Sequence, residues 1–203
     1  MSRKLLQIVI TGVGGQGVLS ASKMLGMAAG NAGLQILTSA VHGMAQRGGV
    51  VETYVIIGER FSPIIDPGEA DMIVGFEPVE TLRALPRGSK HTIVISNTQP
   101  VIPFFCSFSG AKYPGQDEIF NYIILRVKKL ITVNANQLAQ NAGSVLAMNM
   151  TMLGLIAGTQ QLPFDTGILE KTIAENTSAR FREVNVKAFK NGVEYISKKC
   201  KTN

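Results

Sequence analysis

Apolar residues along the chain form short continuous runs and stripes at helical spacing. The first run, at residues 8–10, leads into four glycines within residues 12–17. The run predicts a buried strand. Residues 16–32 predict a helix, because apolar and small side chains recur there at helical spacing and Gly33 can end it. A strand, a glycine turn and a helix are the opening unit of an open α/β sheet.

The rest of the chain alternates apolar runs with amphipathic segments. Further strands are expected at residues 35–40, 50–57, 71–76, 91–96 and 130–134, and further helices from residue 78 and at residues 117–128, 136–141, 144–157, 165–176 and 180–199. This alternation predicts a three-layer α/β/α fold with a mostly parallel open sheet and a glycine-rich first strand–helix turn. We expect one domain over residues 1–203, with a helical C-terminal part from about residue 144.

Some local patterns make sharper predictions. The alternation in residues 50–57 favours a strand with one wetter face, and residues 61–65 could form its hairpin partner before the turn at Asp66. The side chains expected on buried helix faces are Val79, Leu82 and Leu85, then Ile119, Tyr122, Ile123 and Val127, and near the C-terminus Phe181, Val184, Ala188, Phe189, Val193 and Ile196.

The segment 144–157 is apolar almost all round a helix, with Ser144 placed to cap it and Gly158 to end it. A helix of this kind is buried on all sides. Two interpretations stay open, burial in the core of this chain and burial against another subunit. The aromatic, irregular segment 97–115 also allows two interpretations, an interface with another molecule or a loop folded back over the core.

Composition narrows the class of protein. Hydrophobic residues make up 45% and charged residues 17% of the chain, which excludes a disordered protein. The net charge of +6 suits acidic partners, although it can also describe a basic surface alone. Cys106 and Cys200 are too few for a four-cysteine cluster and favour a reducing cytoplasm. The apolar run at 145–157 is shorter than a membrane span, so we expect no membrane partner. We also expect no nucleic-acid partner.

The glycine turn allows several interpretations. Gly12, Gly14 and Gly17 satisfy the dinucleotide fingerprint G-x-G-x-x-G. The fingerprint also needs an acid after the second strand, and residues 1–51 contain no Asp or Glu. NAD is therefore disfavoured, whereas Arg47 could accept the 2′-phosphate of NADP in a self-contained Rossmann-like domain. Alternatively, the glycines only let helix and strand pack closely.

The second predicted strand delivers a second glycine-rich loop, residues 41–49, to the same edge of the sheet. It offers His42, Gln46 and Arg47 as donors, with Gly48 and Gly49 at its end. No nucleophile elbow or catalytic triad accompanies these residues. A chain with two glycine loops and no catalytic set of its own predicts part of a larger enzyme.

Two motifs indicate a family, Gly-Val-Gly-Gly-Gln-Gly-Val at 12–18 and His-Gly-Met-Ala-Gln-Arg-Gly-Gly at 42–49. Together they resemble the gamma-type domain of 2-oxoacid:ferredoxin oxidoreductases. The second motif is similar to the form in the small (beta) subunits that act on indolepyruvate. Segments 68–71, 75–80 and 149–154 extend the resemblance over most of the chain.

The resemblance implies a subunit that is not active alone. Thiamine diphosphate and iron–sulfur clusters would lie in a larger partner chain. The assembled enzyme would convert indolepyruvate or another aryl pyruvate and coenzyme A to aryl-acetyl-CoA and carbon dioxide, reducing ferredoxin. Pyruvate, 2-oxoisovalerate and 2-oxoglutarate are the alternative substrates. We expect no metal ligands in this chain. The expected catalytic residues are His42, Gln46 and Arg47, and the expected cofactor-binding residues are Gly12, Gly14, Gly15, Gln16, Gly17, Gly48 and Gly49.

Overall fold

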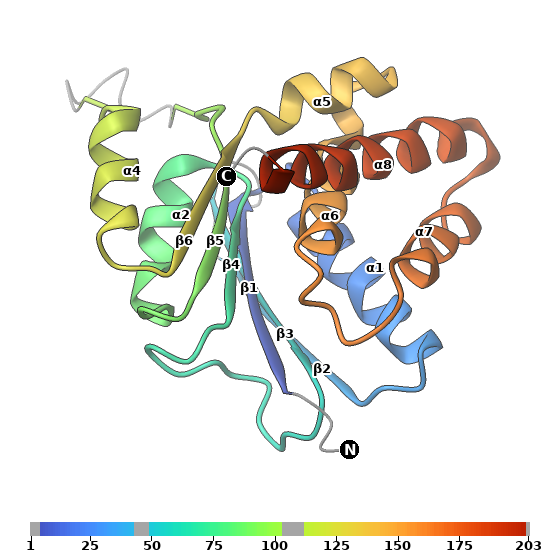
Figure 1. The fold of residues 1–203 in the computed structure, drawn as a ribbon, viewed down its shortest axis with the longest axis horizontal. Helices are drawn as coiled ribbons and strands as arrows, with labels where there is room; N and C mark the ends of the chain where they lie inside the picture. Colours follow the sequence, from blue (N-terminus) through green and yellow to red (C-terminus); the bar gives the residue numbers. More distant parts are fainter. Residues whose placement is uncertain (1–4, 43–48, 103–111, 202–203) are drawn as a thin grey trace.

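The structure, a computed structural model, describes residues 5–42, 49–102 and 112–201 (Figure 1). Its centre is a six-stranded sheet in the order β2-β3-β1-β4-β5-β6. The strands are β1 (Leu6–Val13), β2 (Ile36–His42), β3 (Val50–Ile57), β4 (Met72–Gly75), β5 (Ile93–Asn97) and β6 (Lys129–Val133). Strands β1, β4, β5 and β6 are mutually parallel, whereas β3 runs antiparallel to both of its neighbours. The predicted mostly parallel sheet is confirmed.

Helices cover both faces of the sheet, which gives the three expected layers (Figure 1). One face carries α1 (Val18–Asn31), α5 (Ala135–Ala142), α6 (Met148–Gly158), α7 (Thr166–Glu175) and α8 (Ala179–Lys201). The other carries α2 (Pro78–Ala84) and α4 (Gln116–Ile124), with short 3-10 turns at η1 (Leu85–Arg87) and η2 (Val145–Ala147) elsewhere. In β1, Ile8 packs toward α1 and Val9 toward α2. Burial on both faces explains why this strand is a continuous apolar run.

The predicted wetter face of β3 holds at Val50 and Glu52 but is wrong in the second half of the strand. Tyr54 and Ile56 are buried, because the loop of residues 58–71 lays Ile65 and Ala70 against them. The predicted hairpin partner at residues 61–65 is wrong too: this segment forms no strand. Both edges of β3 are already hydrogen-bonded, one to β1 and one to β2, so no third partner can pair with it.

Three predicted helix faces need correction. The buried residues of α2 are Pro78, Glu80, Thr81 and Ala84, while Val79 and Leu82 are only partly buried. Thr81 faces the sheet, where its hydroxyl forms a 2.9 Å hydrogen bond with the Ser96 hydroxyl of β5. The other two errors are Tyr122, which is 49% exposed on α4, and Phe181, which is 48% exposed in the first turn of α8.

Helix α6 lies in the core of this chain, so the core interpretation of its apolar circumference holds. It crosses α8 so closely that a Cβ at Gly154 would lie 2.0 Å from the Phe189 carbonyl oxygen. A Cβ at Gly192 would lie 2.3 Å from the Thr151 carbonyl oxygen. The helix begins later than predicted, because Ser144 caps η2 and α6 starts at Met148.

Two further points bear on the expectations from sequence. Of the aromatic segment, residues 103–111 lie outside the described part of the chain, while Tyr113 packs on the core beside α2 and α4. Among the described helices, none is both long and apolar enough to cross a membrane.

Candidate functional site

The two glycine segments meet at one edge of the sheet. Strands β1 and β2 run in the same direction with β3 between them, so Gly12 and His42 are both in register with Val51, one on each side. Two strand spacings, about 10 Å, separate the starts of the segments. The prediction that both segments reach the same edge is therefore confirmed.

A backbone hydrogen bond joins the two segments. The Gly14 N–H donates to the Gly49 carbonyl oxygen at 2.8 Å. Gly49 immediately precedes β3, so this bond fixes the end of the second loop against the first turn. Gln46, Arg47 and Gly48 lie outside the described residues, as does the side chain of His42.

The first turn leaves the start of α1 open. Gly15 has φ +102° and Gly17, which precedes the helix, has φ +84°, so both residues need the backbone freedom of glycine. No side chain caps α1, and no acidic residue lies in its first turn. The N–H groups and the positive end of the helix dipole therefore face the edge of the sheet, where an anion can bind.

Gln16 acts within the turn itself. Its side-chain oxygen accepts a hydrogen bond from the Val13 N–H at 2.8 Å, and its amide nitrogen donates to the Phe76 carbonyl oxygen at 3.1 Å. Phe76 directly follows β4, so Gln16 links the ends of two parallel strands. The structure thus gives Gln16 a positioning role, and ligand binding by this side chain stays a prediction.

The glycines of the fingerprint differ in what surrounds them. A Cβ at Gly12 would lie 2.8 Å from both the Gln16 side-chain oxygen and the Phe76 Cβ. A Cβ at Gly17 would lie 2.7 Å from the Asn149 amide nitrogen of α6. Gly12 therefore lets the turn and the end of β4 pack closely on β1, and Gly17 lets the start of α1 approach α6. Gly15 is exposed and has no atom within 4 Å of its Cβ position, so it is the point of the turn that a ligand can approach.

A cavity of about 360 Å³ opens beside the turn, lined in part by Ser20 of α1, Asn149 of α6 and Ser178 next to α8. Leu146 and Phe181 also line it and are 83% and 48% exposed. Apolar side chains exposed at the mouth of a cavity mark a surface that can bind another molecule. This cavity continues the glycine edge toward the helices of the C-terminal part.

Asn97 stabilises this edge, a role that the sequence pattern did not predict. It ends β5 and is fully buried. Its amide nitrogen donates to the Phe76 carbonyl oxygen at 3.0 Å and to the Asn136 side chain at 2.8 Å, while its oxygen accepts from the Ala135 N–H at 3.0 Å. These bonds tie β5 to the end of β4 and the start of α5. A polar residue directly after an apolar strand was the available signal.

Glu77, also missed, holds the start of α2 at the same edge. Its carboxylate accepts hydrogen bonds from the Glu80 N–H at 2.9 Å and from the Tyr113 hydroxyl. Burial raises the pKa of the Tyr113 hydroxyl, and the bond to Glu77 raises it further. Burial likewise raises the pKa of Glu80. The Arg83 guanidinium lowers this pKa and offsets the rise only in part. The Glu77 carboxylate therefore fixes the start of α2, whereas the Glu80 carboxylate pairs with Arg83 through one oxygen and leaves the other buried without a hydrogen-bond partner among the described residues.

Within residues 5–42, 49–102 and 112–201, no group of three or more His, Cys, Asp or Glu side chains is placed to hold a metal ion. The chemistry that the described site offers is the binding of an anion by backbone N–H groups at the uncapped start of α1, beside the cavity.

Comparison with known proteins decides the family. Residues 7–195 match the model of the family described as pyruvate ferredoxin/flavodoxin oxidoreductase. The chain belongs to this family. The match extends from β1 to α8 and includes both glycine segments, so the resemblance predicted from the two motifs is confirmed.

Curated relatives in this family carry the name indolepyruvate oxidoreductase subunit IorB. The chain is 42% identical to the one from Archaeoglobus fulgidus over 187 residues, covering 92% of this chain and 93% of that one. It is 40% identical to the one from Methanothermobacter thermautotrophicus over 185 residues, covering 91% and 94%. The likeness runs over nearly the full length of each.

Solved structures of the family share the fold. The gamma subunit of a keto/oxoacid ferredoxin oxidoreductase from Geobacter sulfurreducens superposes with a TM-score of 0.70 at 20% identity, covering 95% of this chain and 99% of that one. A 2-oxoglutarate:ferredoxin oxidoreductase from Magnetococcus marinus gives a TM-score of 0.72 at 18% identity, covering 98% of this chain and 32% of that one. The latter structure has 2-oxoglutarate, coenzyme A and succinyl-CoA bound.

Proposed function

We propose that this chain is the small, cluster-free subunit of a 2-oxoacid:ferredoxin oxidoreductase that acts on indolepyruvate or another aryl pyruvate. The family match and the identity of 36–42% to four IorB subunits support this assignment. The structural observation that carries it is the bond from Gly14 to Gly49. This bond unites two glycine segments at one open edge that has no catalytic set of its own in the described residues.

In the proposed reaction, the 2-oxoacid loses carbon dioxide and its acyl group passes to coenzyme A. The two electrons released reduce two molecules of ferredoxin, one electron each. Thiamine diphosphate and iron–sulfur clusters supply the carbon–carbon cleavage and the single-electron chemistry. We assign them to a larger partner chain, because the two cysteines here cannot ligate a four-cysteine cluster. Two isolated cysteines also suit a cytoplasmic enzyme.

The part of this chain in that reaction is to bind and orient an anion. The Gly15 region and the uncapped start of α1 offer N–H groups to a coenzyme A phosphate or a substrate carboxylate. Arg47, carried by the second loop, is proposed to add a guanidinium that can form two parallel hydrogen bonds to the same kind of group. His42 and Gln46 are proposed to contact the substrate or the larger subunit.

Anaerobic purification of the tagged chain from its native host tests the proposal, with mass spectrometry of the proteins that accompany it. The expected partner is a larger chain carrying thiamine diphosphate and iron–sulfur clusters. The purified complex should oxidise indolepyruvate in a reaction that depends on coenzyme A. Preference for pyruvate, 2-oxoisovalerate or 2-oxoglutarate would overturn the substrate assignment alone. A chain that purifies by itself and binds NADP would overturn the subunit assignment.

A further inference from the structure

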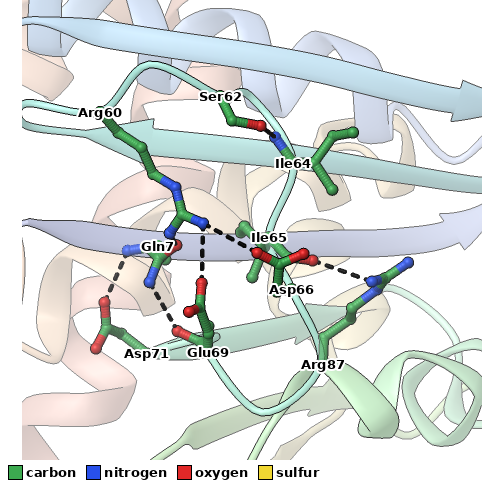
Figure 2. Close-up of polar contacts among 9 residues, drawn as sticks. All are labelled: Gln7, Arg60, Ser62, Ile64, Ile65, Asp66, Glu69, Asp71 and Arg87. Atoms are coloured by element: carbon green, nitrogen blue, oxygen red, sulfur yellow. Dashed lines mark hydrogen bonds and ion pairs between the residues drawn. The ribbon is translucent and has the colours of Figure 1, made fainter.

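The edge of the sheet opposite the glycine segments carries a well-braced loop, residues 58–71, which joins the end of β3 to the start of β4 (Figure 1). Arg60 lies near the start of this loop and bonds to the side chain of Gln7 in β1 (Figure 2). The same guanidinium forms ion pairs with Asp66 at 3.4 Å and Glu69 at 2.9 Å. Arg60 thus links the first arm of the loop to its second arm and to β1.

Gln7 strengthens this bracing (Figure 2). Its amide nitrogen donates to the Glu69 carbonyl oxygen at 3.0 Å, and its backbone N–H donates to the Asp71 carboxylate at 2.8 Å. The loop so fixed presents Phe61 wholly to solvent, at 106% exposure, and Ile64 at 51%. A rigid loop that exposes an aromatic ring can bind a partner with little loss of entropy, and aromatic rings often carry most of the binding energy at interfaces.

A pocket of about 510 Å³ lies at the same edge, between the end of α2 and the end of α4. Leu82, Leu85 and Pro86 form one wall, and Tyr122 and Arg126 form the other. The Arg126 guanidinium lies 3.4 Å from the centre of the Tyr122 ring. An apolar pocket of this size with one guanidinium at its mouth can take up an aromatic side chain from an acidic segment.

Hydrogen bonds join the loop to η1, which forms part of the pocket. Gly68 and Ala70 of the loop donate hydrogen bonds to the carbonyl oxygens of Pro86 and Arg87, at 3.1 and 2.8 Å. The Arg87 side chain donates in return to the Ile65 carbonyl oxygen at 3.0 Å. These bonds anchor residues 65–70 of the loop to η1, whose Leu85 and Pro86 line the pocket.

The two features carry opposite charge. Lys90, Arg126 and Lys128 are exposed near the pocket, and residues 81–116 contain no Asp or Glu. The loop carries four acids, Glu59, Asp66, Glu69 and Asp71, against the single cation Arg60, which pairs with Asp66 and Glu69, so an excess of negative charge remains. Opposite charges on neighbouring patches favour the approach of a surface that has the same two patches in reverse order.

We propose that two copies of this chain associate through this edge, with Phe61 of each copy inserted into the pocket of the other. A twofold axis allows the insertion of both rings and the pairing of charges at once, because the acidic loop of each copy then faces the basic rim of the other. The aromatic ring and the pocket would each be used twice. The interface leaves the glycine edge free and does not depend on which 2-oxoacid is the substrate.

Sedimentation velocity of the purified full chain, from 1 to 150 µM, tests this proposal. The wild-type chain should form a dimer, and Phe61→Ser should raise its dissociation constant by about tenfold or more. Phe181→Ser is the matched control, since that ring is exposed next to the opposite edge, and it should leave the dissociation constant unchanged. A wild-type chain that stays monomeric at 150 µM, or a Phe61→Ser dimer as tight as the wild type, overturns the proposal.

A mixing experiment tests the pairing of ring and pocket directly. Arg126→Glu places an acid at the pocket mouth and should also weaken the dimer, while keeping Phe61. Mixed with Phe61→Ser, which keeps an intact pocket, it should form a heterodimer that retains one of the two contacts. This heterodimer should be tighter than either variant's homodimer. Equal affinity of all three pairs would contradict the insertion of Phe61, even if the wild-type chain is a dimer.

Discussion

Gly15 and Gly33 lie at opposite ends of α1 and share the same backbone requirement. Their φ angles are +102° and +71°, and no atom lies within 4 Å of either Cβ position. Alanine at each position should cost about 1 kcal/mol of stability through backbone strain. Only Gly15→Ala should also raise the KM for coenzyme A or the 2-oxoacid in the assembled enzyme. Steady-state kinetics of the two variants check this, and equal kinetics would exclude Gly15 from the ligand site.

Gln16 explains how the turn keeps its shape. In Gln16→Leu, the Val13 N–H loses its side-chain partner and the Phe76 carbonyl oxygen keeps only the bond from Asn97, so we expect a loss of about 2 kcal/mol in the free energy of unfolding. Urea denaturation measures this loss. Gln161→Leu serves as the control because Gln161 is exposed, and it should change stability by less than about 0.5 kcal/mol. A Gln16→Leu chain as stable as the control would contradict the positioning role.

Glu80 predicts a pH dependence. Burial raises its pKa above the ordinary value of 4.5, so the folded state binds a proton more tightly than the unfolded state does. Its contribution to stability is therefore complete below about pH 4.5 and is lost as the pH rises through the raised pKa. As the pH increases through this range, Glu80→Gln should become more stable than the wild-type chain. Thermal melts from pH 4 to 8 check it, and a difference that is constant with pH would refute it.

At the scale of elements, the crossing of α6 and α8 decides how the C-terminal part packs. A Cβ at Gly154 would lie 2.0 Å from a carbonyl oxygen of α8, so Gly154→Ala should push the helices apart and cost about 3 kcal/mol or more. Gly30→Ala is the matched control, since that helical glycine has open space at its Cβ position and alanine there should gain about 0.5–1 kcal/mol. Chemical denaturation of both variants measures the two effects. Equal stability changes would show that α6 and α8 can separate freely.

The same crossing shows where sequence periodicity stops being informative. The segment 144–157 is apolar on all sides, which fits a core helix and a subunit interface equally well. Gly154 and Gly192 decide in favour of the core, because each sits where the other helix's backbone approaches. Their significance depends on a pairing between residues 38 positions apart, which no local pattern contains.

At the scale of the whole molecule, the two edges of the sheet are proposed to have different partners. Leu146, 83% exposed beside the glycine turn, is expected to contact the larger subunit. Leu146→Asp should therefore reduce the amount of larger chain that co-purifies, without lowering the melting temperature of the isolated chain. Leu125→Asp at the opposite edge is the control, since Leu125 is 68% exposed there, and it should leave this association intact. Equal co-purification of the larger chain with both variants would contradict the assignment.

The sequence by itself determined the order of strands and helices, the glycine turn and the mostly parallel sheet. These follow from short-range periodicity and from glycine and proline at element ends, which act within a few residues. The resemblance in the two motifs was enough to name the family. Gly12, Gly14 and Gly17 could be chosen from spacing alone, although spacing could not separate the glycines needed for packing from the open Gly15.

Only the tertiary structure decided the features that depend on distant contacts. Burial of the second face of β3 depends on a loop that follows it, and the antiparallel placement of β3 between β1 and β2 depends on strand order. The side chain of Gln16 turns inward because Phe76, sixty residues away, offers it a carbonyl oxygen. Asn97 and Glu77 gain their roles in the same way. Hydrogen bonds and close packing between remote residues set these features, and such contacts exist only once the chain has folded.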